Sequence, residues 1–207
     1  MKRLTSVFGV VVLVSIIFLS GCASYNACAL NNLTPVFVQK STGNNTGISN
    51  DVVVIGKIFN KADCKKYLDR DVIAEGYQPI QLFIQNSSPK NYVFSLIRIS
   101  IPCVRPEEVA EKVHTSTAGR ATAYGLGALL FWPLAFPAII DGLKSSDANK
   151  NLDNDFSSKT ARDQVIGAHS YLNKLIFVPA NEGLSNFTVT LMDQESGELK
   201  ELQVVNQ

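Results

Sequence analysis

The chain has few of the residues and motifs from which catalytic and metal sites are recognised. Its 207 residues include two histidines, His114 and His169, and one tryptophan. Neither histidine has a neighbouring Ser, Cys or carboxylate pattern that suggests a triad, and no Gly-x-Ser-x-Gly elbow occurs. No Cys-x-x-Cys pair or histidine-rich tract indicates zinc. We therefore predict no cofactor and no metal, and a non-catalytic role; an enzyme with an active site assembled from distant positions is the alternative.

The chain also lacks an excess of either positive or negative charge. The formal net charge is +1, and two of the positive residues, Lys2 and Arg3, stand at the very start of the chain. No basic stripe favours nucleic acid, and no acidic tail favours a basic partner. We therefore expect no nucleic-acid partner.

The first apolar run ends at a cysteine. Lys2 and Arg3 precede the run Val7 to Leu19, which is shorter than the ~20 residues of a transmembrane helix. The four residues Leu19-Ser20-Gly21-Cys22 resemble the lipobox of bacterial lipoproteins. That resemblance implies a diacylglyceryl group on the Cys22 thiol, cleavage before Cys22 and acylation of the new amino terminus. An ordinary cleavable signal or an uncleaved anchor helix is the alternative.

This resemblance sets the expected organisation and location. Residues 1–21 are predicted to be a signal peptide, 22–50 a lipidated flexible tether rich in Asn, Ser, Thr and Gly, and 51–207 the folded domain. Several acyl chains hold a protein firmly on a membrane. Ala23 and Ser24 follow the cysteine in place of the Asp that retains enteric lipoproteins in the inner membrane. We expect a protein of the bacterial cell envelope, lipid-anchored in the outer membrane and facing the periplasm.

The folded part is predicted to be mainly β. Val52 to Ile55, Leu172 to Val178 and Asn186 to Met192 are strand-like. Tyr77 to Gln85 and Tyr92 to Ile101, joined by a polar turn, are predicted to pair as a hairpin. Gln194 to Gly197 is the turn into a last strand, Leu199 to Val205. We predict an antiparallel immunoglobulin-like β-sandwich, interrupted by a helical insertion at about 104–168.

Two short helices have clear start signals. Asn60 is a predicted N-cap for a helix through Asp63, Lys65, Lys66 and Leu68. Pro106, followed by Glu107 and Glu108, is predicted to begin another, because proline suits the first turn and acids suit the positive end of the helix dipole.

The insertion contains twenty consecutive uncharged residues, Ala121 to Ile140. Pro133 and Pro137 predict a helix to about Phe131, a break, and a second short helix to Leu143. Three interpretations of this apolar hairpin are open. It packs in the core, or it contacts a protein partner or the bilayer. The third is that it spans the membrane, which the prolines oppose. The second alternative gives a hydrophobic interaction surface for the membrane or an envelope protein, with these candidate residues: Tyr124, Leu129, Phe131, Trp132, Phe136 and Ile139.

Three cysteines remain besides Cys22, namely Cys28, Cys64 and Cys103. An oxidising compartment favours disulfides, and a Cys64–Cys103 bond with a free Cys28 is one prediction. Three unpaired thiols are the alternative, because spacing alone does not show that two Cα atoms lie within bonding range.

Three stretches between about Ala62 and Val178 resemble a loose group of uncharacterised bacterial envelope lipoproteins. They are Lys66 to Asp71 leading into Gly76 to Ile80, the proline-broken apolar segment, and Asp141 to Leu152. The resemblance implies location and architecture but no activity. Together with the lipobox it favours a non-catalytic binding or structural component of the envelope.

Overall fold

The computed structural model describes residues 24–33, 48–49, 51–115, 135–181 and 186–206. They belong to two compact units. Asn26–Val113 and Leu152–Gln207 form one, which we call the β domain, and His114–Asn151 falls in the other. The fold below is that of the β domain.

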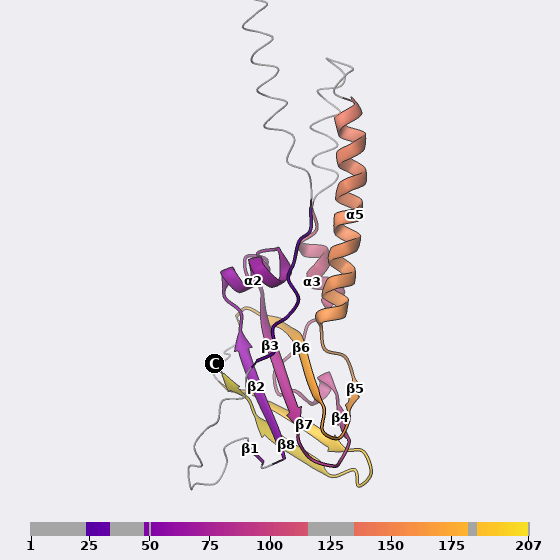
Figure 1. The fold of residues 1–207 in the computed structure, drawn as a ribbon. Coiled ribbons are helices and arrows are strands. Elements are labelled where there is room, and N and C mark those ends of the chain that lie inside the picture. Colours follow the sequence, from indigo (N-terminus) through magenta and orange to yellow (C-terminus); the bar gives the residue numbers. More distant parts are fainter. Residues whose placement is uncertain (1–23, 34–47, 50, 116–134, 182–185, 207) are drawn as a thin grey trace, which may run out of the picture. The chain divides into compact units, whose positions relative to one another are not determined.

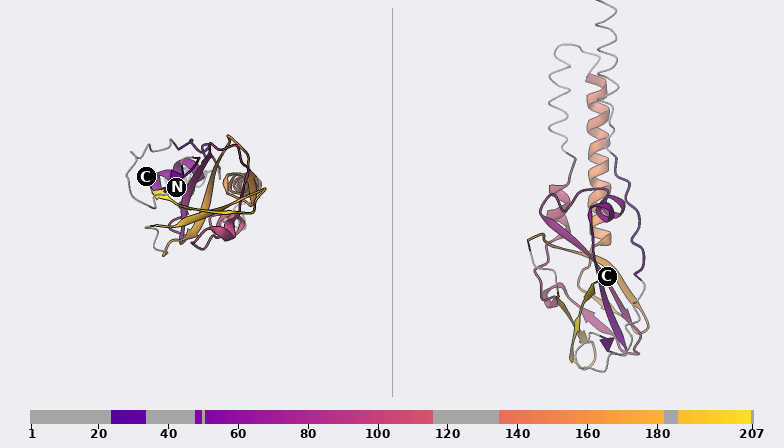
Figure 2. Two further views of the ribbon diagram at one scale, coloured as in Figure 1. Left: turned by 90° about the horizontal axis from the view of Figure 1, so that it is seen from below. Right: turned by 90° about the vertical axis from the view of Figure 1, so that its left-hand side faces the viewer.

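The β domain consists mainly of two antiparallel sheets (Figure 1). In spatial order, the first contains β1 (Ile48–Ser49), β2 (Val52–Ile58), β3 (Tyr77–Asn86) and β6 (Tyr171–Pro179), with β9 (Val205–Asn206) parallel to β2. The second contains β5 (Gln164–Ile166), β4 (Tyr92–Phe94), β7 (Thr188–Asp193) and β8 (Leu199–Gln203). Figure 2 shows the two sheets as separate layers.

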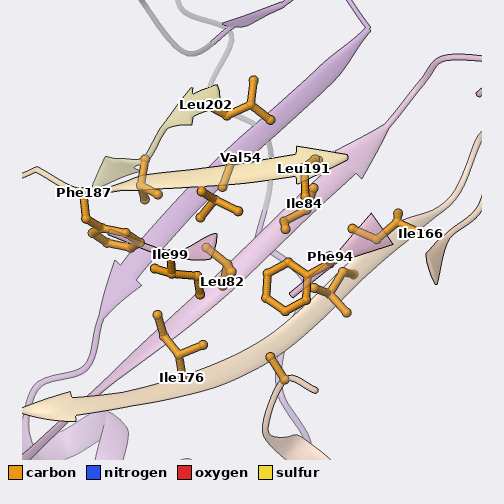
Figure 3. Packing of buried hydrophobic residues seen from close by; sticks show 14 of the residues in the cluster. Val54, Leu82, Ile84, Phe94, Ile99, Ile166, Ile176, Phe187, Leu191 and Leu202 are labelled. Atoms are coloured by element: carbon orange, nitrogen blue, oxygen red, sulfur yellow. The ribbon is translucent and has the colours of Figure 1, made fainter. Parts of the chain in front are cut away.

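One hydrophobic core lies between the sheets. Alternate residues of β3, Ile80, Leu82 and Ile84, point into it, as the period of two in a strand requires. Leu191 of β7 meets them from the second sheet (Figure 3), and Val189 of the same strand belongs to the same core. β7 and β8 form the predicted hairpin, with Thr188 paired to Gln203 and the turn at Gln194 to Gly197.

The outer face of the first sheet is covered as well. Phe156, from the helix that precedes β5, stacks on Phe177 with ring centroids 5.6 Å apart. Leu33 packs against Ile55 and Phe83. β3 is therefore buried on both faces, and even its polar residue Gln81 is only 2% exposed.

Two short helices begin as the sequence predicts. In α2 (Lys61–Leu68) the Asn60 side chain accepts a hydrogen bond from the Asp63 N–H, and the Asp63 side chain accepts one from the Asn60 N–H. This reciprocal capping satisfies two backbone donors that the helix leaves unpaired. Pro106 is the first residue of α3 (Pro106–Lys112), and Val109 and Val113 of its one face are buried.

The predicted hairpin between Tyr77–Gln85 and Tyr92–Ile101 is wrong. β3 pairs with β2 and β6, whereas β4 pairs with β5 and β7 in the other sheet. The second strand is also short, because Leu96–Arg98 form a 3-10 helix, η1. An arch from one sheet to the other buries the same alternate side chains as a hairpin, so alternation does not distinguish them.

The second helix of the insertion does not end at Leu143. It is α5 (Ala135–Lys159), a continuous helix of 25 residues. Pro137 is its third residue, where a backbone N–H has no partner within the helix, so the proline does not interrupt it. The sheet resumes with β5 at Gln164, inside the range 104–168 that was assigned to the insertion. The first half of the predicted helical hairpin, with its break at Trp132-Pro133, lies outside the described residues.

Candidate functional site

The residues that follow the predicted lipid-bearing cysteine are attached to the β domain. The Asn26 N–H donates to Asp69 Oδ2 at 3.0 Å, and the Cys28 N–H donates to the Lys66 carbonyl at 2.9 Å. Both acceptors lie at the end of α2. We call Asn26–Leu33 the N-terminal segment; it runs from α2 across the first sheet (Figure 1).

Polar residues of the first sheet hold the rest of the N-terminal segment. The Asn31 carbonyl accepts hydrogen bonds from Gln81 Nε2 at 2.6 Å and from Asn173 Nδ2 at 3.2 Å. Beyond them, Leu33 is buried. A buried glutamine must be hydrogen-bonded to be tolerated. Here the N-terminal segment supplies one acceptor for Gln81 Nε2, and Asn173 Oδ1 supplies the other at 2.7 Å. Over Asn26–Leu33 the structure therefore has a docked segment where a flexible tether was predicted, and residues 34–47 lie outside the described part.

Asp69 joins the N-terminal segment to two helices. It caps α2 in the left-handed conformation, with φ of 51°, and pairs with Lys65 and Arg70. Burial opposes its ionisation, but the hydrogen bonds from Lys65 and the Asn26 N–H outweigh it and hold the pKa of Asp69 below its usual value. Arg70 Nε also donates to the Val113 carbonyl at 3.2 Å. Asp69 and Arg70 thus connect Asn26, α2 and the end of α3.

A buried lysine connects the end of α5 to α2. Lys159 Nζ donates to the Tyr67 carbonyl at 2.7 Å and to Asp155 Oδ2 at 2.6 Å, and its side chain is 8% exposed. Buried charge is costly unless it is paired and hydrogen-bonded. Both conditions are met, so this lysine is a structural connection.

A groove of about 700 Å³ lies between the N-terminal segment, the last turn of α5 and β6. Tyr171, at its rim, is 58% exposed and stacks on Phe83 with centroids 5.6 Å apart. The polar groups that line the groove bond to the protein itself, as when Lys174 Nζ donates to the Ser158 carbonyl at 2.6 Å. The groove has the polar walls of a binding site and no nucleophile next to a base.

A second, more apolar groove of about 510 Å³ runs beside η1 and the start of α3. Ile97, which is 88% exposed, lies on its edge. Cys103 lines it, but burial raises the pKa of this thiol to about 11, so little of the reactive thiolate forms near neutral pH. This groove also lacks the chemistry of a catalytic site.

The outer face of the second sheet carries an apolar row across all four strands. Val165 pairs with Val93, Val93 with Met192, and Met192 with Leu199, so all four side chains share one face. Val165 is 48% exposed and Leu199 is 60% exposed. Arg98 reaches Met192 with Nη2, and its buried Nη1 has no hydrogen-bond partner among the described residues.

The predicted disulfide is not formed in this structure: Cys28, Cys64 and Cys103 are free thiols. Cys64 is buried within α2, and Cys103 lies beside Ile101, whose carbonyl it contacts at 3.8 Å. The two cysteines are enclosed by different parts of the domain. Burial, together with Asp71 and Asp63, raises the pKa of Cys64 to about 11.

Most of the predicted site residues lie outside the described part of the chain. They are Cys22, Tyr124, Leu129, Phe131 and Trp132. Phe136 and Ile139 are residues of α5. Among the helices that the structure describes, none is both long and apolar enough to cross a bilayer.

The two histidines belong to different compact units. His169 is an exposed turn residue with φ of 51°, and its N–H donates to the Ser88 carbonyl at 3.2 Å. His114 belongs to the other compact unit. Within the described ranges, no three His, Cys, Asp or Glu side chains gather as metal ligands would.

The docking of the N-terminal segment was not predicted from the sequence. Its Asn-rich composition is typical of a loop, and its contacts are to residues as distant in sequence as Asn173. The one available signal is the apolar pair Leu30 and Leu33 within a polar stretch, which indicates that one side of the segment packs against the domain. No family model, curated protein or solved structure matches the chain.

Proposed function

We propose that this chain is a lipoprotein of the bacterial cell envelope, anchored through Cys22 in the outer membrane and facing the periplasm. Its β domain acts as a non-catalytic binding or structural component. The segment Ala121 to Ile140 supplies a hydrophobic contact with the membrane or an envelope protein, through the residues Tyr124, Leu129, Phe131, Trp132, Phe136 and Ile139.

The docked N-terminal segment is the observation that carries this proposal. The N-terminal segment is hydrogen-bonded to the β domain from Asn26 onward, which is four positions after Cys22. A segment held so soon after the predicted cleavage point suits a mature chain that begins at Cys22. It also suits an anchor that must hold the domain near a surface.

The strand order supports an immunoglobulin-like sandwich for the domain. Taking β2, β3, β4, β6, β7 and β8 as strands A, B, C, E, F and G, one sheet has the order A-B-E and the other C-F-G. This is the arrangement of immunoglobulin-like folds, with β5 as an added strand beside C. Such sandwiches carry many unrelated functions, so the fold alone assigns none.

A binding role is supported by the two open grooves and by the apolar row Val165, Val93, Met192 and Leu199. Neither groove has a nucleophile, base and oxyanion donor converging on one point. Apolar side chains that line up across an exposed sheet face are typical of surfaces where proteins associate.

Fatty-acid labelling of the full chain in a bacterial host tests the anchor. Cys22→Ala is expected to abolish incorporation of a radioactive fatty acid and to release the protein, or its precursor, from the lipidated membrane pool. Cys28→Ala is the matched control, because it removes an exposed cysteine six positions later and is expected to leave labelling unchanged. Undiminished labelling of Cys22→Ala would refute the proposal.

A further inference from the structure

We propose that the β domain presents its α2 end to the lipid bilayer and its opposite end to the periplasm. By the α2 end we mean the surface formed by α2, Asp69, Arg70 and the last turn of α3. This inference rests on the proposed lipidation of Cys22 and adds an orientation to it.

The short tether between lipid and domain holds the α2 end next to the bilayer. Asn26 is four positions after Cys22, and a fully extended chain over four such steps spans about 14 Å. Asn26 is bonded to Asp69 at 3.0 Å, and Cys28 to the Lys66 carbonyl at 2.9 Å. The α2 end must then lie within that reach of the acyl chains.

The chain also leaves the β domain for the insertion at this end. Val113 is the last residue before the other unit, and its carbonyl accepts from Arg70 Nε. Arg70 Nη1 in turn bonds to Asp69, which holds Asn26. These three contacts bring the exit at Val113 next to the entry at Asn26.

The chain returns to the domain at the same end. Phe156 of α5 contacts Phe177, and Thr160, the residue after the helix, bridges to Leu175, two residues earlier in β6. The end of α5 therefore advances toward the start of β6. Because β6 ends beside Tyr77, at the start of β3 near α2, tracing α5 backward to Leu152 leads toward the α2 end. The predicted apolar stretch lies, in sequence, between Val113 and Leu152.

The charges of the α2 end do not oppose contact with a membrane surface. Lys61 pairs with Asp71 and Lys65 with Asp69, while the exposed Lys66 lies over the Tyr67 ring. The face therefore has a small positive excess at most, which does not repel anionic lipid. The orientation is set mainly by the short tether and is expected to change little with salt.

The opposite end is far from the bilayer in this arrangement. β3 runs from Tyr77, near α2, to Asn86, and ten strand residues span about 30 Å. Asn86 bonds to the Lys90 carbonyl, and Lys90 pairs with Asp193 at the β7–β8 turn. Glu195, in that turn, therefore marks the periplasmic end.

Fluorescence quenching on vesicles tests the orientation with the full lipidated chain. A fluorophore is placed at Glu111→Cys, on the last turn of α3, or at Glu195→Cys, both of which replace exposed glutamates. Cys28 is changed to Ser in both, whereas Cys64 and Cys103 react slowly because burial raises their pKa to about 11. The vesicles are phosphatidylethanolamine and phosphatidylglycerol with a nitroxide on part of the headgroups.

The expected result is strong quenching at position 111 and several-fold weaker quenching at position 195, with little change at high salt. Equal quenching, stronger quenching at 195, or no quenching in protein that floats with the vesicles overturns the orientation while leaving the lipid anchor standing. Protein that fails to float refutes the anchor itself and the orientation with it. Circular dichroism of both labelled proteins checks that each is folded.

Discussion

The ring of Phe156 lies nearly parallel to that of Phe177, at 11° and with 5.6 Å between centroids. Both side chains are fully buried. A helix that the sequence assigns to an insertion therefore ends as part of the sheet's covering layer. Its last turns belong to the domain's core, whatever the function of the preceding apolar residues.

Phe156→Ala is accordingly expected to lower the free energy of unfolding by about 3–5 kcal/mol, the usual cost of removing a buried phenylalanine. Urea denaturation of the lipid-free chain measures it. Asn154→Ala, two residues earlier and exposed, should change the value by less than about 0.5 kcal/mol. Equal effects of the two substitutions would show that this part of α5 is not packed on the sheet.

The cap of α2 gives a second prediction. Asn60→Ala removes the acceptor for the Asp63 N–H, which it binds at 2.9 Å, and should cost about 1 kcal/mol. Asn60→Ser keeps a capping oxygen and should retain most of the stability. Thermal melts of the three proteins distinguish a lost cap from a general effect of substitution at this position, which would make Ser as costly as Ala.

Local signals made the helix starts at Asn60 and Pro106 predictable, because a cap and its partner lie within one turn of each other. The strand at Tyr77 was equally visible from its alternation. Its partners were not, since a hairpin and an arch bury the same face. The docked N-terminal segment depends on hydrogen bonds that Asn31 accepts from Gln81 and Asn173, which lie 50 and 142 positions further along the chain. No local sequence pattern predicts such distant contacts.

Asp193 predicts a dependence of stability on pH. Its carboxylate accepts hydrogen bonds from Lys90 Nζ at 2.6 Å and from the N–H groups of Glu195 and Ser196, which hold its pKa well below its usual value. A carboxyl with a lowered folded pKa stabilises the protein above its unfolded pKa, about 3.9. That contribution is lost as pH falls further, toward the folded pKa.

Melting temperatures measured from pH 7 to pH 2 should therefore fall steeply below about pH 4. In Asp193→Asn this acid-dependent fall should be smaller, and the melting temperature at pH 7 lower. Asp51→Asn, at an exposed turn, is the control and should follow the parent curve. A parent-like acid profile for Asp193→Asn would contradict the role given to the Lys90–Asp193 pair.

The cysteines give the last prediction, which tests their free state directly. In lipid-free protein that begins at Ala23, only Cys28 should react quickly with a thiol reagent at pH 8. With a pKa of about 11, Cys64 and Cys103 each present roughly one thiolate in a thousand there. After unfolding without reductant, three thiols should titrate. A single thiol in the unfolded protein would instead show that Cys64 and Cys103 are joined, as an oxidising compartment would favour, and that the domain rearranges to bring them together.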